Sequence, residues 1–346
     1  MKWLNKRIPI DPETLKTLGS EPVPYHLKRW WFCLGGTPFY LFVVQVVTGI
    51  LLSFYYIPNA DFAYESVAHI SHEVPFGWWI RSIHKWSSNL MIVAVLLHVL
   101  RVFFTGAYRA PREINWMIGS VILFTVLGFG FTGYSLIHEQ LSYWGATVAG
   151  NLLNSVPLVG HHISNFFLGG ETISGNTLTR FFIFHIGILP TIMIALLLGH
   201  IALVRLLGVT KFTFKRQTVS PYATFPFYPD HVLTELIIGV VLMILLTSFA
   251  CIFPAELGEK ANPLLTPSHI KPEWYFYFTF SWLKLTGLTF AILSLGFFAF
   301  LFVLWPFVDA QIRKRLPDSE ISVYIGIVGF AILVILTLIE AFGWLH

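Results

Sequence analysis

Four histidines in two strongly apolar stretches have the type and spacing to do chemistry. His84 and His98 are fourteen residues apart, and His185 and His200 are fifteen apart. At about 1.5 Å of rise per residue, each interval spans about 21–22 Å of helix, which is much of a hydrocarbon core about 30 Å thick. An unpaired imidazole at that depth is costly, so such histidines are functional candidates. Two pairs at nearly equal separation predict two shared ligands, one near each membrane face, and a haem held by two axial imidazoles fits this arrangement.

The composition is that of a polytopic helical membrane protein. Of the 346 residues, 55% are hydrophobic and 12% are charged, which excludes an ordinary soluble domain. The two cysteines, Cys33 and Cys251, are too few for a disulfide framework or for a zinc or iron–sulfur site. No pattern indicates a nucleic-acid partner. The first 32 residues lack the apolar core of a cleaved signal peptide, so we expect the first apolar helix to direct insertion into the lipid membrane.

Apolar segments of sufficient length predict seven transmembrane helices. They cover residues 34–56, 80–104, 114–136, 180–206, 232–253, 287–308 and 321–344. We therefore expect an all-α polytopic membrane protein whose first four transmembrane helices form a bundle around the histidines.

The chain divides into three predicted parts. Residues 1–32 form an interfacial N-terminal segment, residues 33–210 the four-helix bundle, and residues 211–346 a C-terminal three-helix domain. Two connections are long, with about 43 residues between the third and fourth helices and about 33 after the fifth. The first contains a helical pattern over residues 143–153. Loops of this length in a compact protein are usually functional.

Lysine and arginine are unevenly distributed between the two ends of the predicted helices. With a cytoplasmic N-terminus, sixteen of the 22 lie on the cytoplasmic side and six on the outer side. The positive-inside rule favours this orientation, which puts the C-terminus and both long loops outside. His84 and His185 then lie at the outer ends of their helices, and His98 and His200 lie deeper. The predicted pairs are His84 with His185 and His98 with His200.

Glycines in the first and third predicted helices repeat the histidine spacing. Gly35 and Gly49 are fourteen residues apart, and so are Gly119 and Gly133. Glycine in a membrane helix lets a neighbouring surface approach closely. We expect flat macrocycles to press against these helices at two levels, although ordinary helix packing would explain any one of the four.

Four basic side chains near the histidines could pair with carboxylates on a bound macrocycle. They are Arg81, Lys85, Arg101 and Arg180, which lie where the predicted helices meet water. Snorkelling of an interfacial side chain is the alternative for each.

Several motifs carry a resemblance to a known family. They are Arg81 to Trp86 (Arg-Ser-Ile-His-Lys-Trp), His98 to Arg101, Gly133 to Leu136, Tyr143 to Thr147, Thr177 to Phe181, and Pro272 to Tyr275 (Pro-Glu-Trp-Tyr). From about residue 22 to its C-terminus, the chain resembles cytochrome b of the quinol:acceptor oxidoreductases, the cytochrome bc1 and b6f complexes. It is most similar to a prokaryotic b6f-like form with the small companion subunit fused at its C-terminus.

The resemblance implies a function and a set of site residues. Two b haems would be bound, one by His84 and His185 and the other by His98 and His200. Quinol would be oxidised on the outer side, with Glu273 accepting a proton and Tyr134 and Tyr275 orienting the substrate or lining its pocket. Pro272, Glu273, Trp274 and Tyr275 would form the quinol-site loop. Electrons would cross through both haems to quinone near the cytoplasmic face, coupled to proton translocation.

The resemblance also implies partners and a location. A Rieske iron–sulfur protein would take one electron, because this chain has no cysteine set for such a cluster. A c-type cytochrome and a second copy of this chain would complete the complex, in the inner membrane of a bacterium.

Cys33 precedes Leu34-Gly35-Gly36, where b6f-type proteins attach an extra haem by one thioether bond. The resemblance therefore implies a third haem, covalently bound through Cys33. Cys251 is expected to be a small buried apolar residue.

One segment departs from the family pattern. After Gly-Tyr-Ser-Leu the family usually continues with Pro-Trp, then Gly or Asp, then Gln, but here the run is Ile137-His138-Glu139-Gln140. His138 and Glu139 could add proton acceptors beside the quinol pocket, or the loop could adopt a different conformation; both remain open. His161 and His162 are expected to be surface residues.

Two other functions fit some of these features. One is a dihaem quinone-reactive anchor subunit of another respiratory oxidoreductase, which would not split electrons between two acceptors. The motif from Pro272 to Tyr275 in a long outer loop argues against it. The second is a transporter whose histidines relay protons, which would lack the optical spectrum of a b haem.

Overall fold

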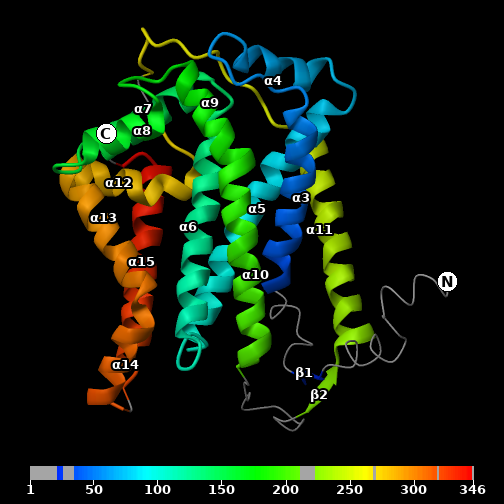
Figure 1. The fold of residues 1–346 in the computed structure, drawn as a ribbon, viewed down its shortest axis with the longest axis vertical. Coiled ribbons are helices and arrows are strands. Elements are labelled where there is room, and N and C mark those ends of the chain that lie inside the picture. The colour runs from blue at the N-terminus through cyan, green and yellow to red at the C-terminus, as the bar shows by residue number, and fades with distance from the viewer. Residues whose placement is uncertain (1–21, 26–34, 211–222, 268–269, 318, 345–346) are drawn as a thin grey trace, which may run out of the picture.

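The computed structural model describes residues 22–25, 35–210, 223–267, 270–317 and 319–344. Cys33 and most of the predicted N-terminal segment lie outside these ranges. Long helices run side by side between two faces (Figure 1). We call the face with α4 (Ala63–His72), α7 (Gln140–Asn154) and α8 (Gly160–Leu168) the upper face, and the face with α14 (Trp305–Arg315) the lower face.

Within the described residues, six helical segments are long and apolar enough to cross a membrane. They are α3 (Gly36–Ser53), α5 (Gly77–Phe104), α6 (Glu113–Ser135), the continuous segment of α9 (Gly175–Ile183), η3 (Phe184–Ile188) and α10 (Leu189–Leu207), the segment of η4 (Phe227–His231) and α11 (Val232–Ile252), and α15 (Ile321–Ala341). The prediction of a polytopic helical membrane protein is confirmed.

The predicted sixth span is not one straight helix. It consists of α13 (Leu288–Val303) and α14, which are bent by 66° at the break between them. Pro306 explains the break, because proline has no N–H for the carbonyl four residues earlier and its ring clashes with that carbonyl. The freed carbonyl of Phe302 instead accepts a hydrogen bond from Trp116 Nε1 at 2.8 Å. Among the described residues, the number of spans is therefore seven only if this bent pair counts as one.

The first four spans pack into a bundle. Helix α3 packs against α5, α5 against α6, and α6 against α10. Leu41, Ile92, Val126 and Met193 are buried together, and each comes from a different one of these helices. In sequence, each lies about midway between the two histidines or two glycines of its helix. An apolar layer therefore separates the two histidine levels.

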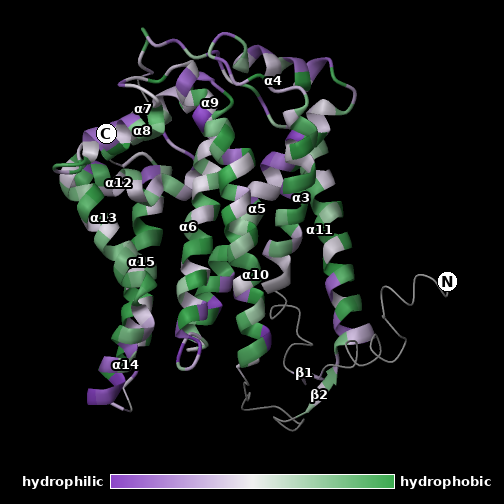
Figure 2. Cartoon of the chain, in the orientation of Figure 1, coloured by the Kyte–Doolittle hydropathy of each residue, from purple (hydrophilic) through white to green (hydrophobic). Residues whose placement is uncertain are grey.

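Hydrophobic residues predominate along the long helices, whereas hydrophilic residues gather on the upper-face segments and on α14 (Figure 2). Helix α11 exposes Leu233, Leu236, Ile237 and Val240, each more than half accessible. A face of this kind is suited to lipid tails. Cys251 is also exposed on α11, so the expectation that it is buried was wrong. A weakly polar thiol is as stable against lipid tails as it is in the protein interior. Sequence periodicity alone does not distinguish a lipid-facing position from a buried one.

A short antiparallel pair of strands joins distant parts of the chain at the lower face. Strand β1 (Pro22–Pro24) pairs with β2 (Thr224–Pro226), with Val23 opposite Phe225. The sequence did not predict this pair, since three residues with proline at their ends carry no strand periodicity. The helical pattern in the first long loop does correspond to a helix, α7.

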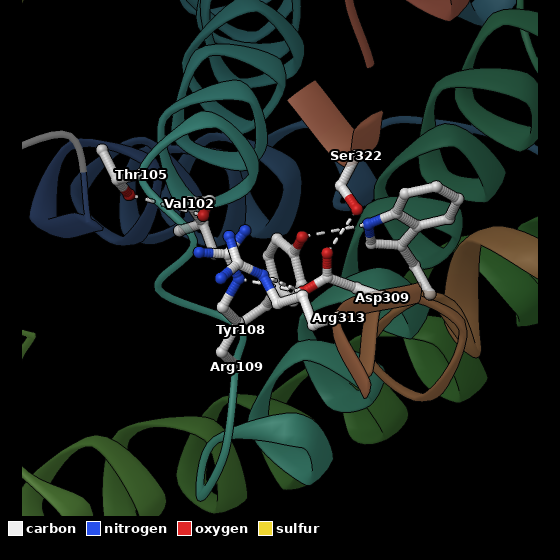
Figure 3. Close-up of polar contacts among 8 residues, drawn as sticks. Val102, Thr105, Tyr108, Arg109, Asp309, Arg313 and Ser322 are labelled. Carbon is white, nitrogen blue, oxygen red and sulfur yellow. Dashed lines mark hydrogen bonds and ion pairs between the residues drawn. The ribbon is translucent and has the colours of Figure 1, made fainter. Parts of the chain in front are cut away.

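A buried carboxylate docks the C-terminal helices onto the bundle at the lower face (Figure 3). Asp309 on α14 is only 1% exposed and accepts a hydrogen bond from Arg109 Nε at 2.9 Å. The hydroxyl of Ser322 on α15 donates to its other oxygen. Because Arg109 lies in the turn between α5 and α6, one side chain ties three segments together. Removing one partner of such a buried pair is strongly destabilising.

Candidate functional site

The four histidines form two facing pairs. The ring centres of His84 and His185 are 6.3 Å apart, with the rings inclined at 68°. Those of His98 and His200 are 6.4 Å apart, inclined at 73°. The first pair lies towards the upper face and the second towards the lower face, because α5 runs from the upper to the lower face.

These separations fit a metal ion held between two imidazoles. An imidazole nitrogen lies about 1.2 Å from the centre of its ring and binds a metal at about 2 Å. Two axial imidazoles on one iron therefore hold their ring centres about 6.4 Å apart. Two imidazoles joined directly by one N–H···N hydrogen bond would have ring centres closer together than this. Both pairs thus match the spacing required by a bis-histidine haem.

A π-helical turn accounts for the unequal histidine spacing. His185 lies in η3, where the Leu189 N–H bonds to the Phe184 carbonyl five residues earlier. A π turn inserts one extra residue into an α-helix and often marks a functional site. Pro190 follows at the start of α10 and has no N–H to continue the usual ladder. The fifteen residues from His185 to His200 therefore span nearly the same height as the fourteen from His84 to His98.

Each of the four predicted glycines lies against one of the four imidazoles. A Cβ built on Gly35 or Gly49 would lie 3.7 or 3.3 Å from Cε1 of His98 or His84. The glycines of α6 are placed in the same way. A Cβ built on Gly119 would lie 3.3 Å from Cε1 of His200, and one built on Gly133 would lie 2.7 Å from Cε1 of His185. The absent side chains therefore give room to the imidazole rings themselves. The expectation that macrocycles press against these two helices stays a prediction.

Two threonines position the upper histidines. Thr48 Oγ1 lies 2.8 Å from His84 Nδ1, and Thr132 Oγ1 lies 3.0 Å from His185 Nδ1. A metal-binding histidine usually uses its other ring nitrogen in such a contact, which fixes the ring orientation. The sequence interpretation missed both residues. The available signal was a Thr-Gly dipeptide, Thr48-Gly49 and Thr132-Gly133, repeated in the first and third spans.

A matched pair of alanine substitutions in α6 tests the role of glycine. In G133A the new Cβ would lie 2.7 Å from His185 Cε1, whereas in G128A it would lie 3.8 Å from Leu189 Cδ1, an ordinary contact. Overpacking of this kind costs about 1–3 kcal/mol, so we expect G133A to weaken haem binding at the upper level. The measurement is haem content after purification. Equal haem content in the two variants would contradict the prediction.

The upper histidines open onto a cavity of about 430 Å³. Most of the residues predicted for the quinol site reach the same cavity. Its lining includes His84, His185, Gly49, Gly133, Arg81, Lys85, Tyr134, Glu139, Glu273 and Tyr275. The two long loops thus bring the predicted quinol-site residues to the level of one histidine pair.

Glu273 enters this cavity from the second long loop. It precedes the short helix η5 (Trp274–Phe276), which leads into α12 (Tyr277–Thr286). Burial raises the pKa of the Glu273 carboxyl above its ordinary value, Lys85 lowers it, and Glu139 raises it. A carboxyl tuned in this way is suited to accept and release protons near neutral pH.

The two tyrosines pack against glycines on neighbouring helices. A Cβ at Gly130 would lie 2.8 Å from the Tyr275 hydroxyl, so the phenol ring lies directly on α6. A Cβ at Gly145 would lie 3.1 Å from Cε1 of Tyr134. Burial raises the pKa of Tyr275, so its hydroxyl stays protonated and can donate a hydrogen bond.

Trp274 lines a second cavity of about 390 Å³ beside the first. Its Nε1 donates to Asn89 Oδ1 on α5 at 2.6 Å. Lys85 and Glu273 line both cavities. Pro272 is partly buried in the segment just before η5. The four residues of the predicted loop therefore do different things, and Glu273 and Tyr275 are the two that reach the cavity at the histidine level.

The four predicted basic side chains differ in their surroundings. Lys85 lines both cavities, and Arg101 Nη2 lies 3.1 Å from His98 Nδ1. Arg180 donates to the carbonyls of Asn165 and Phe166 at the end of α8. Arg81 is 9% exposed and forms hydrogen bonds with the second long loop.

Residues 253–265, which we call the strap, cross the upper side of the cavity. Arg81 donates to the carbonyls of Ala255 and Glu256 at 2.6 and 2.9 Å. Segment 137–140, which departs from the family's sequence pattern, forms hydrogen bonds with Gly258 and Glu259 of the strap. The Gly258 N–H donates to Glu139 Oε2 at 2.7 Å, and the Gln140 N–H donates to the Glu259 carbonyl at 2.8 Å.

His138 has a left-handed backbone, with φ of 56°. Burial lowers the pKa of its imidazole, and Lys260 lowers it further. His161 and His162 are exposed on α8, as expected.

Comparison with known proteins gives a consistent result. A family model described as cytochrome b/b6/petB matches residues 18–208, and one described as cytochrome b(C-terminal)/b6/petD matches residues 260–343. The cytochrome bc complex cytochrome b subunit of Chlorobaculum thiosulfatiphilum is 36% identical over 340 residues, covering 97% of this chain and 79% of that protein. Cytochrome b6 of Heliomicrobium gestii is 43% identical over 210 residues, covering 61% of this chain and 99% of that protein.

A solved structure, titled hyperthermophilic respiratory Complex III, has the same fold. It superposes with a TM-score of 0.80 at 26% identity, covering 98% of this chain and 97% of that one. Long apolar helices that enclose two facing, partly buried histidine pairs define the class, an integral membrane protein of cytochrome type. The chain belongs to the cytochrome b/b6 family, whose members bind b haems. The N-terminal and C-terminal family models both match within this one chain, which confirms the resemblance.

Proposed function

We propose that this chain is the dihaem cytochrome b subunit of a quinol-oxidising complex of the bc or b6f type, coupled to proton translocation. The observation that carries the proposal is the shared cavity: Glu273 and Tyr275 line the same 430 Å³ space as His84 and His185. A substrate there would lie beside a proton acceptor and at the level of one histidine pair. Relatives named as a bc complex subunit and as respiratory Complex III support this assignment.

His84 and His185 would hold one b haem, and His98 and His200 the other. The two haems would supply one-electron carriers between the quinol side and a quinone-reducing side near the lower face. The facing rings and their fit to a bis-histidine metal ion support this ligand set. The lysine and arginine distribution supports a cytoplasmic lower face and N-terminus and an outer upper face. A bacterial inner membrane fits the bacterial relatives.

At the upper face, Glu273 accepts a proton from quinol, and the Tyr134 and Tyr275 hydroxyls orient the substrate. Oxidation of one quinol to quinone releases two electrons and two protons. One electron leaves to a Rieske iron–sulfur protein. A c-type cytochrome and a second copy of this chain complete the proposed assembly.

The test is quinol-driven haem reduction in the purified membrane complex. Added quinol should produce the reduced b-haem absorption bands, and the preparation should contain an iron–sulfur protein. A preparation without b-haem bands, or one whose b haems accept no electrons from quinol, would overturn the proposal.

We further propose a third haem, attached covalently through Cys33. The cysteine lies outside the described residues, and the proposal rests on its place before Leu34-Gly35-Gly36 in a b6f-like chain. After denaturation and acid–acetone extraction, the wild-type polypeptide should retain one haem and C33S none. C251S, which removes the exposed cysteine of α11, should retain it. A wild-type polypeptide that loses all its haem under these conditions has no thioether-bound haem.

A further inference from the structure

A second carboxylate shares the cavity with Glu273. Glu139 lines it from the turn between α6 and α7, whereas Glu273 comes from the second long loop. The two residues are 134 positions apart in sequence and line the same cavity. Electrostatic repulsion between them contributes to the raised pKa of Glu273.

A hydrogen bond from the strap fixes the position of the Glu139 carboxylate. Its Oε2 accepts the Gly258 N–H at 2.7 Å. Arg81, Tyr134 and Glu273 are the groups that interact electrostatically with it across the cavity. Arg81 supplies the positive charge on this side.

Glu139 also borders the surface. Its side chain is partly exposed, and its backbone forms a bridge with Lys260 of the strap. Lys260 Nζ lies 2.5 Å from Glu65 Oε1, and both side chains are about half exposed, at 47% and 51%. The residues next to Glu139 therefore lead from the cavity to charged groups in contact with water.

We propose that Glu139 is a second acid–base residue of the quinol pocket, which receives the proton collected by Glu273 and releases it at the upper face. This inference rests on the proposed quinol oxidation. The proton moves from the quinol hydroxyl to the Glu273 carboxylate, then to the Glu139 carboxylate, and then to water. Both carboxylates end each cycle ionised, and no electron passes through them.

Electrostatics within the cavity predict a pH signature. Glu273 is faced by Lys85 on α5, Tyr134 on α6, Glu139 on the turn, Tyr275 on η5 and Tyr277 on α12. The positive charge of Lys85 lowers the pKa of Glu273, and the negative charge of Glu139 raises it. Removing the charge of Glu139 should therefore lower the pKa of Glu273. The acid limb of the rate profile, which requires ionised Glu273, should then move to lower pH.

The experiment compares E139Q, E139D and E259Q in the intact complex, by following quinol-driven b-haem reduction across pH. Glutamine keeps an amide oxygen for the Gly258 N–H, so the strap stays anchored. Glu259 is exposed on the same strap and lies outside the cavity lining, so E259Q removes a nearby charge without touching the pocket. We expect E139Q to turn over about tenfold more slowly, a small part of what acid–base catalysis can contribute, with the acid limb shifted to lower pH. E139D should recover most of the rate, and E259Q should behave as wild type.

Two outcomes would overturn the relay. One is an E139Q profile equal to that of E259Q. The other is a slower E139Q rate with an unmoved acid limb, which would show that Glu139 does not act on the proton held by Glu273. In both cases the wild-type complex still reduces its b haems with quinol, so the proposed function stands. If the wild-type complex fails to do so, the proposed function itself is wrong.

Discussion

Replacing His185 with leucine is expected to remove the haem of the upper pair while leaving that of the lower pair. Leucine cannot bind iron, and His84 alone would offer one axial ligand. The lower pair is separated from the upper one by the apolar layer around Ile92 and Met193. The b-haem content should therefore fall by about half, as expected when one of two bis-histidine sites is lost.

Optical spectroscopy of purified H185L, with haem quantified per polypeptide, measures this loss. The matched control is H162L, which makes the same change at an exposed histidine of the upper face. It should keep the full haem content. If H185L retained both haems with unchanged spectra, His185 would not be a ligand, and the pairing of His84 with His185 would have to be abandoned.

Substitution of Glu273 by glutamine is expected to slow quinol oxidation by about 10²-fold, the lower range for losing a general base. The amide has nearly the same shape and still fills its place before η5. It cannot take the proton from quinol. Both b haems should remain, because Glu273 lies in the second long loop and not on a histidine helix.

The pH dependence of quinol oxidation should also change in E273Q. Burial raises the pKa of Glu273, so the fraction of ionised base grows with pH through a range above that of an exposed glutamate. The wild-type rate should therefore rise with pH over that range, and the rise should be missing in E273Q. The control is E73Q at the upper face, since the Glu73 side chain is 73% exposed. A wild-type rate profile in E273Q would show that Glu273 has no essential proton role.

Much of the arrangement could be predicted from composition and spacing. Apolar length predicts where helices cross lipid, because the bilayer imposes one length on every span. Within a helix, the rise per residue converts sequence separation into height. The order of His84 and His98 along α5, and of Gly119 and Gly133 along α6, therefore already places them at two levels.

Features that depend on contacts between distant segments could not be predicted from spacing within single helices. The bend at Pro306 depends partly on Trp116, whose indole satisfies the Phe302 carbonyl. The exposure of Cys251 depends on which face of α11 meets its neighbours. The β1–β2 pair joins residues about 200 positions apart, and neither three-residue strand has an alternating pattern that would predict it.

The levels of the four histidines and of the four matching glycines follow from the amino-acid sequence, because the helical rise converts their spacing into height. What those residues face depends on how the helices pack. The tertiary structure turned each glycine towards an imidazole and placed a π turn at His185. It also brought Glu139 into one cavity with Glu273. These are contacts between helices and loops far apart in the chain, and they depend on packing and on backbone hydrogen bonds that local patterns do not encode.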